Sequence, residues 1–132
     1  YIFMGIKDYQ QLYLVKNYIE KKYECKVVPC KTIRNSNKLA LSSRNLLLNK
    51  KAMIQAESLT KDLIKFKKDL VNVKNIKNSL NSKKKELSKL YNIFIEYLEL
   101  RNKKTLKRIY NNKCSKLFIS YYLNNVRLID NF

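Results

Sequence analysis

The sequence predicts an α/β fold, with one strand–helix–strand unit followed by helices packed on a small antiparallel sheet. Three observations predict it. An apolar run that stops at a glycine opens a strand–helix–strand order over residues 1–30. Two long amphipathic patterns follow over residues 49–91. Near the end, two β-rich runs flank a pair of asparagines.

The first unit is short. Residues 1–4 form an apolar strand ending at Gly5, the only glycine. Residues 9–22 carry apolar side chains at helical spacing, and residues 25–30 form a second strand that includes the only proline. This order implies two parallel strands joined by a helical crossover. Because two strands do not make a stable α/β sheet alone, we expect the rest of the sheet to precede Tyr1.

The second unit is expected to contain helices first and strands after them. After a polar loop over residues 31–48, Asn49 is placed to cap a helix with buried positions up to Phe66. A second helix is expected over residues 71–91, with Lys83–Lys85 on a solvated face. Strands are expected over residues 95–101, 116–123 and 126–129, and the last two are joined by a hairpin turn at Asn124-Asn125.

Composition bounds the function. Of 132 residues, 45% are hydrophobic and 29 are Lys or Arg against 10 acidic ones, which gives a formal charge of +19. No apolar stretch is long enough for a membrane span, and the start does not resemble a signal peptide. The lysines are spread along the chain, and the abundance of Lys, Asn, Ile and Tyr is typical of an AT-rich genome. We therefore do not expect a nucleic-acid partner, although the charge leaves a polyanion surface open.

Cysteine and histidine usage excludes several enzyme classes. There are 3 cysteines without a C-x-x-C pair and no histidine. The chain alone therefore cannot build a Ser-His or Cys-His nucleophile, and we expect no metal site. Free thiols fit a reducing cytoplasm.

One cluster of candidate site residues follows the first strand. Gly5 lets a ribose or phosphate approach the backbone, Lys7 offers a charge to a phosphate, and Asp8 can accept hydrogen bonds from ribose hydroxyls. Gln11 lies one helical turn after Lys7 and can face the same cleft. The alternative is an ordinary helix start with Asp8 in its first turn.

A second cluster lies in the polar loop. Ser42, Ser43 and Arg44 supply two hydroxyls and a guanidinium, which suit the oxygens of a phosphate that is transferred or leaves. The alternative is a surface loop whose arginine lies over its neighbours. The residues alone do not decide between these interpretations.

A resemblance connects the two clusters. The strings G-I-K-D-Y-Q-Q-L, T-I-R, L-A-L-S-S-R-N-L, Y-L-E-L-R-N-K-K-T-L and R-L-I-D-N are similar, in order, to the C-terminal half of the pantothenate synthetase (pantoate–β-alanine ligase) family. The resemblance implies the tail of a Rossmann-like nucleotidyltransferase domain over residues 1–32 and a C-terminal α+β domain over residues 33–132. It also implies a cytoplasmic, ATP-dependent, AMP-forming ligase that joins pantoate to β-alanine through pantoyl adenylate, with Mg²⁺ on the triphosphate and a homodimer for the full-length enzyme.

The resemblance also implies roles for individual residues. Gly5 and Asp8 match positions that contact the ATP ribose, and Lys7 matches a lysine that binds phosphate oxygens. Gln11 matches a pantoate-binding glutamine. Ile33 matches a position whose backbone meets adenine, whereas Ser42, Ser43 and Arg44 match the loop that closes over the phosphates.

The sequence departs from the family pattern at several positions. Members usually have Glu at Ile6, Pro at Lys31, and an acidic residue followed by Gly at Asn37-Lys38, where the lysine is expected to stiffen the loop. The His-x-Gly-His segment of the family is not in this sequence. We therefore expect the chain alone to be inactive. A basic nucleic-acid-binding module and an inactive remnant of the ligase are the alternative interpretations.

Overall fold

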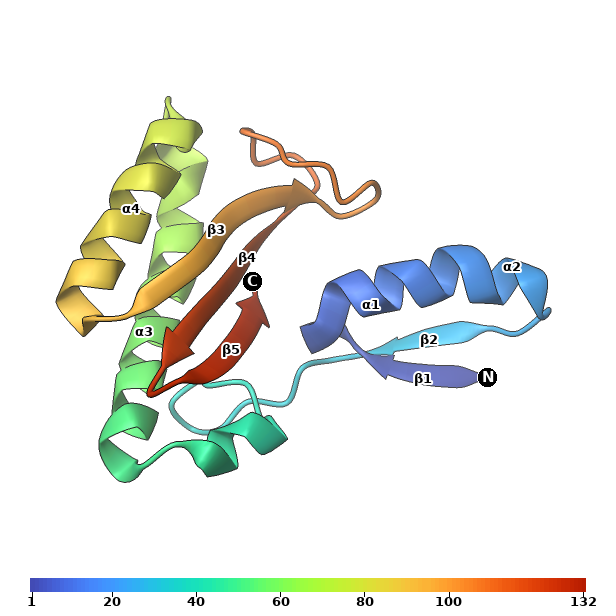
Figure 1. Cartoon of the computed structure of the whole chain (residues 1–132). Coiled ribbons are helices and arrows are strands. Elements are labelled where there is room, and N and C mark those ends of the chain that lie inside the picture. The colour runs from blue at the N-terminus through green and yellow to red at the C-terminus, as the bar shows by residue number, and fades with distance from the viewer. The chain divides into compact units, whose positions relative to one another are not determined.

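The computed structural model describes all 132 residues, which form two compact units, Tyr1–Ile33 and Arg34–Phe132 (Figure 1). The first unit contains β1 (Ile2–Gly5), the 3-10 turn η1 (Ile6–Asp8), α1 (Tyr9–Leu14), the π-helical segment η2 (Val15–Ile19), α2 (Glu20–Lys22) and β2 (Val27–Cys30). The second contains η3 (Ser43–Leu47), α3 (Lys50–Asp69), η4 (Leu70–Asn72), α4 (Ile76–Tyr91), β3 (Phe94–Asn102), β4 (Ser115–Leu123) and β5 (Val126–Asn131). None of the helices is both long enough and apolar enough to cross a membrane.

The first unit is the expected strand–helix–strand arrangement. β1 and β2 pair in parallel, with Ile2 opposite Val27 and Gly5 opposite Cys30. Side chains alternate along β1, so that Ile2 is half-buried while Phe3 is exposed. Leu12 of α1 and Val27 are the buried apolar residues of this unit. The small two-stranded sheet therefore presents one of its faces to solvent.

A single helical run links these strands. It is α-helical in α1 and α2 but π-helical over η2, a local widening of the helix. Its end is fixed by Glu20, whose carboxylate accepts a 2.9 Å hydrogen bond from the backbone N–H of Val27. This bond connects the end of the helix to the start of β2.

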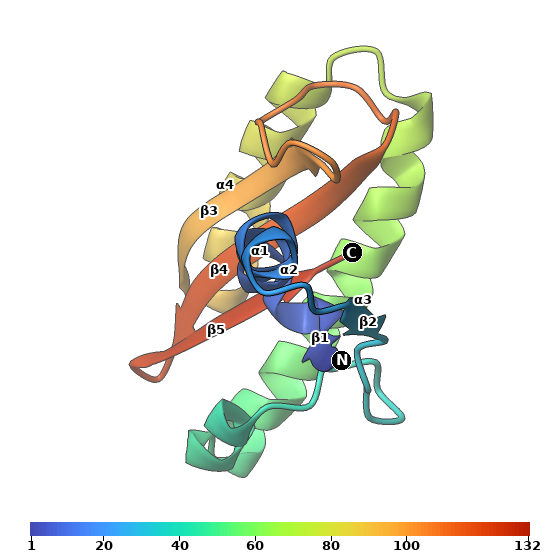
Figure 2. The same ribbon diagram turned by 90° about the vertical axis from the view of Figure 1, so that its right-hand side faces the viewer.

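The second unit packs helices on one face of an antiparallel sheet. The strand order is β3-β4-β5, and α3 and α4 lie on the same side of the sheet (Figures 1 and 2). Ala52, Ala56, Leu59 and Leu63 recur at helical spacing along α3 and are at most 1% exposed. They join alternate sheet residues such as Leu117 in a single apolar core. Each fully buried leucine contributes about 1.5–3 kcal/mol.

Local signals in the sequence set the ends of these elements. The Asn49 side chain accepts a 2.9 Å bond from the backbone of Ala52 and caps α3, as expected. Asn124 and Asn125 adopt positive φ values of 49° and 62° in the β4–β5 turn, which confirms the expected hairpin.

Two expectations for the second helix are wrong in detail. The helix begins at Ile76 and not at residue 71, because α3 ends in the turn η4 and Asn75 caps a new helix by accepting a 3.0 Å bond from the backbone of Asn78. Lys83 and Lys84 are also only half exposed. Lys83 pairs with Glu86 at 2.6 Å, and Lys84 donates to the carbonyl of Glu96 at 3.0 Å.

Candidate functional site

The first group of site residues follows the end of β1. Gly5 ends the strand with φ −67° and ψ 134°, an extended conformation open to any residue. A Cβ placed on Gly5 would meet no atom within 4 Å. Neither backbone strain nor packing inside the chain therefore requires a glycine here. The open space next to its backbone is available to a ligand.

Lys7, Asp8 and Gln11 lie just beyond this strand end. Lys7 and Asp8 belong to the 3-10 turn η1, and Gln11 lies in the first turn of α1. Asp8 occupies the N-cap position of α1 but makes no side-chain capping bond. Asp8 and Gln11 are exposed and Lys7 is half-buried. The structure thus places all three on one short segment, with the carboxylate not used as a helix cap.

The second group lies on a loop of the other unit. Ser42 precedes η3, and its hydroxyl oxygen accepts a 3.3 Å hydrogen bond from the backbone N–H of Arg44. Ser43 and Arg44 are exposed, whereas Asn45 is only 9% exposed. The buried Asn45 donates from Nδ2 to the carbonyl of Ala40 at 3.0 Å. Ser43 and Arg44 therefore form the exposed tip of a loop whose base is closed by the hydrogen bond between Asn45 and Ala40.

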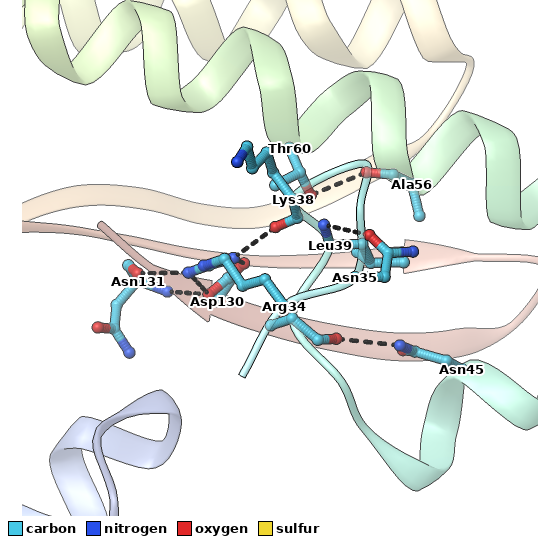
Figure 3. A network of polar contacts seen from close by, with 10 residues as sticks. Arg34, Asn35, Lys38, Leu39, Asn45, Ala56, Thr60, Asp130 and Asn131 are labelled. Carbon is cyan, nitrogen blue, oxygen red and sulfur yellow. Dashed lines mark hydrogen bonds and ion pairs between the residues drawn. The ribbon is translucent and has the colours of Figure 1, made fainter. Parts of the chain in front are cut away.

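The start of this loop is held by a partly buried ion pair (Figure 3). The Arg34 guanidinium donates to both carboxylate oxygens of Asp130, at 2.7 and 2.9 Å. It also donates to the carbonyls of Lys38 at 3.0 Å and Asn131 at 3.2 Å, and lies 5.0 Å from the ring centroid of Phe132. The two-pronged arrangement is the strong form of an arginine–carboxylate pair.

A tight turn over Asn35–Leu39 follows Arg34. The Asn35 side-chain oxygen accepts bonds from the backbone of Asn37 and Leu39, each at 3.0 Å. The side-chain nitrogens of Asn35 and Asn37 donate to the two carboxylate oxygens of Glu57 on α3, at 2.7 and 2.8 Å. The turn is thus fastened to the helix by one carboxylate.

Lys38 completes that turn in an unusual conformation. Its φ is 74°, in the left-handed region that favours glycine. The resemblance described above implies glycine at this position, and the backbone conformation here also favours glycine. The lysine side chain is exposed and does not pack in the core.

Arg44 itself contacts the last strand. Its Nη1 donates to the backbone carbonyl of Arg127 at 2.9 Å. The side chain of Arg127 in turn donates from Nε to Glu96 at 2.9 Å. Hydrogen bonds from Ser120 and from Arg127 hold the pKa of Glu96 below its ordinary value. The carboxylate is therefore occupied, and Arg44 bonds a neutral carbonyl that a phosphate can outcompete.

No part of the chain gathers three or more His, Cys, Asp or Glu side chains that could hold a metal ion. The free cysteines are Cys25 and Cys30, which are half-buried, and the exposed Cys114. The chemistry available at the two groups is thus that of cations, hydroxyls and amides, which bind anions and orient them.

The expected site residues form two groups, one on each compact unit. Gly5, Lys7, Asp8 and Gln11 share the first unit with Ile33, whose side chain is 72% exposed. Ser42, Ser43 and Arg44 belong to the second unit.

Comparison with known proteins identifies the family. The family model described as pantoate-beta-alanine ligase matches residues 1–132, the whole chain. The chain belongs to the pantoate–β-alanine ligase family. A pantothenate synthetase from Flavobacterium psychrophilum is 34% identical over 133 residues, which cover 98% of this chain and 47% of that relative. A bifunctional pantoate ligase/cytidylate kinase from Prochlorococcus marinus is 37% identical and is covered over 25% of its length.

Solved ligase structures share the fold. A crystal structure of pantoate-beta-alanine ligase (pantothenate synthetase) from Thermus thermophilus aligns with a TM-score of 0.86 at 26% identity, over 98% of this chain and 48% of that one. The Francisella tularensis ligase, solved with Beta-gamma ATP and beta-alanine, aligns with a TM-score of 0.70 at 27% identity, over 98% of this chain and 42% of that one. The chain spans about half the length of these pantothenate synthetases.

The residues that support the Ser42–Arg44 loop are not predicted as site residues from the sequence. Arg34 and Asp130 lie within the T-I-R and R-L-I-D-N strings that carried the resemblance, but their pairing across 96 positions leaves no local pattern. Asn45 follows Arg44 in the L-A-L-S-S-R-N-L string, and its buried amide explains why an asparagine follows the exposed arginine. Glu57 carries no signal apart from its place on the helix.

Proposed function

We propose that this chain is the C-terminal half of an ATP-dependent, AMP-forming ligase that condenses pantoate with β-alanine. The observation that carries the proposal is the family match over residues 1–132, which includes both polar segments in the expected order. The exposed tip at Ser43 and Arg44 and the open space beside Gly5 support it.

The proposed reaction has two steps. A carboxylate oxygen of pantoate attacks the α-phosphorus of ATP, the bond from that phosphorus to the bridging oxygen breaks, and pyrophosphate leaves. The amine of β-alanine then attacks the carbonyl carbon of the adenylate, AMP leaves and the amine loses a proton. No covalent bond to the enzyme forms, so the protein supplies orientation and charge stabilisation.

Each site residue has a role in this scheme. Gly5 and Asp8 contact the ribose, the backbone of Ile33 meets adenine, and Gln11 binds pantoate. Lys7 stabilises charge at the α-phosphate. Ser42, Ser43 and Arg44 bind the oxygens of the leaving pyrophosphate, in the manner of other preorganised donors aimed at developing charge.

The remaining features of the proposal concern cofactor, location and assembly. Mg²⁺ would be held mainly by the triphosphate oxygens of ATP and would neutralise part of their charge. The full-length ligase is a cytoplasmic homodimer. The N-terminal half supplies the other wall of the cleft, so the chain alone neither forms pantothenate nor binds ATP tightly.

The test is a chimera in which this chain follows the N-terminal half of the Flavobacterium psychrophilum pantothenate synthetase. Incubated with ATP, pantoate and β-alanine, the folded chimera should release AMP and pantothenate in equal amounts, and neither half alone should do so. A folded chimera without turnover would contradict the proposed activity. Substantial turnover by the 132-residue chain alone would show that half of the cleft suffices.

A further inference from the structure

We propose that Arg34, Asp130 and Glu57 are positioning residues, which fix the base of the Ser42–Arg44 loop so that only its tip moves onto a nucleotide. The functional part of this inference rests on the proposed ligase activity. Its structural part concerns contacts within the second unit alone and is tested separately.

The first fixed point is the pair between Arg34 and Asp130. Asp130 lies on β5, is 7% exposed, and pairs across the sheet with Ile119 of the fully buried core. The guanidinium of Arg34 occupies both carboxylate oxygens and also bonds two carbonyls. Removal of Arg34 would leave a buried carboxylate without its cation, which is strongly destabilising. The ion pair therefore holds the start of the loop to the last strand.

The second fixed point is Glu57. Its two carboxylate oxygens each accept one side-chain amide, from Asn35 and from Asn37. Lys61 of the same helix donates to the side-chain oxygen of Asn37 at 3.0 Å. The turn that precedes the site residues is therefore fastened to α3 as well as to β5.

The third contact separates the base of the loop from its tip. Arg34 and Ala40 form an isolated antiparallel bridge, and Asn45 closes the loop onto the carbonyl of Ala40. Leu39, Ala40 and Asn45 are buried, whereas Leu41, Ser43 and Arg44 are exposed. The segment between Ala40 and Asn45 is the part left to move.

β5 also receives the tip. Arg44 donates to the carbonyl of Arg127, on the same strand as Asp130. A single strand thus holds the loop base through a charged pair and the tip through a neutral carbonyl. A two-pronged pair between a guanidinium and an anion is stronger than a single guanidinium bond to an uncharged carbonyl, so an arriving phosphate draws Arg44 off its carbonyl while Arg34 stays on Asp130.

The structural part is tested by amide hydrogen exchange on the 132-residue chain. In Arg34→Met, the amides of Asn35, Leu39 and Asn45 should exchange about tenfold faster or more, while amides of β3 and β4 keep their rates. Arg101→Met is the matched control, because Arg101 also bonds a carboxylate, Glu99, and a carbonyl, that of Leu106, but lies on β3 at the opposite edge of the sheet. Unchanged loop exchange in Arg34→Met, or equal loop exchange in both variants, would overturn the inference. If Arg34→Met does not fold, Glu57→Gln gives the same comparison, because it removes one charge and leaves one acceptor.

The functional part is tested in the chimera. Arg34→Met should lower kcat for pantoate-dependent ATP–pyrophosphate exchange about tenfold or more, with KM for ATP changed less than about threefold, because the charge on the leaving pyrophosphate, and so its contact with the loop, grows in the transition state. Arg34→Lys should restore part of the rate. Arg101→Met with an equal loss of Tm should keep its kcat, and a matching kcat loss there would reduce Arg34 to a stability role. An inactive parent chimera would contradict the proposed function. Amide hydrogen exchange on the 132-residue chain would still show whether the base of the loop is fixed.

Discussion

Arg44 donates to the backbone carbonyl of Arg127 at 2.9 Å, so the arginine expected to meet a phosphate rests on the last strand of the domain. Arg127 directs its own side chain toward Glu96, and hydrogen bonding to that carboxylate raises the pKa of its guanidinium. Arg44 therefore bonds only a carbonyl of this strand, because the nearby Glu96 carboxylate is already paired with the Arg127 side chain. An arginine held in this way is available to a phosphate and is kept out of other ion pairs.

We predict that Lys38→Gly stabilises the chain by about 1 kcal/mol, because Lys38 has a φ of 74° and an L-residue with a Cβ is strained in that region. Chemical denaturation monitored by circular dichroism measures the change. The matched control is Lys65→Gly, at an exposed position inside α3, which should cost about 1 kcal/mol, because glycine is unfavourable in a helix interior. Destabilisation by both substitutions would show that the turn does not favour glycine.

We predict that Gly5→Ala leaves the stability of the chain unchanged or slightly raised, since its φ is −67° and a Cβ meets no atom within 4 Å. In the chimera the same methyl group should weaken ATP binding, because the space it fills is proposed to hold the ribose. Thermal unfolding of the chain and ATP titration of the chimera give the two measurements. A stable variant with unchanged ATP affinity would remove Gly5 from the nucleotide site.

Much of the fold follows from local sequence signals, and the reasons are physical. Asn49 caps a helix and the Asn124-Asn125 pair turns a hairpin, because each of these effects acts within a few residues of the chain. The break before α4 is not visible in the hydrophobic pattern, because apolar residues continue through Leu70 and Val73. A new helix begins there because the Asn75 side chain accepts a hydrogen bond from the backbone N–H of Asn78.

The candidate site was predictable only as a set of chemical groups. The hydroxyls and the guanidinium of Ser42–Arg44 can be read from the sequence, and the family resemblance implies that they bind phosphates. The contacts that hold this loop in place cannot be read from the sequence. Asp130 meets Arg34 through the position of β5 in the folded sheet, and Glu57 meets Asn35 and Asn37 through the position of α3 beside the loop. Such long-range polar contacts have no periodicity along the chain.

Lys116 predicts a pH dependence of stability. Burial, and then the nearby positive charge of Lys103, lower the pKa of Lys116 from 10.5 to about 8. Between these values the unfolded state binds more protons than the folded state, so stability should rise with pH from about 8 to 10.5. Below that window, the folded state bears the cost of the buried charge.

Lys116→Met should therefore raise Tm at pH 7, and its advantage over the parent chain should shrink as the pH passes through 8 toward 10.5. Thermal unfolding of both proteins at several pH values measures the difference and cancels the titration of other groups. Lys113→Met, at an exposed position just before β4, is the control and should show no such trend. An advantage that is constant across this range would mean that Lys116 titrates at its ordinary pKa in the folded chain.

The nucleotide-site roles of Lys7 and Arg44 are tested most directly by pantoate-dependent ATP–pyrophosphate exchange in the chimera, since this half-reaction needs the phosphate-binding residues and not β-alanine. Lys7→Ala and Arg44→Ala should each lower the exchange rate by about 10² or more, the scale of losing one donor to developing charge. Lys51→Ala, which removes an exposed charge from α3, should retain the parent rate. Exchange at the parent rate in Lys7→Ala and Arg44→Ala would contradict the assignment of these residues to the nucleotide site.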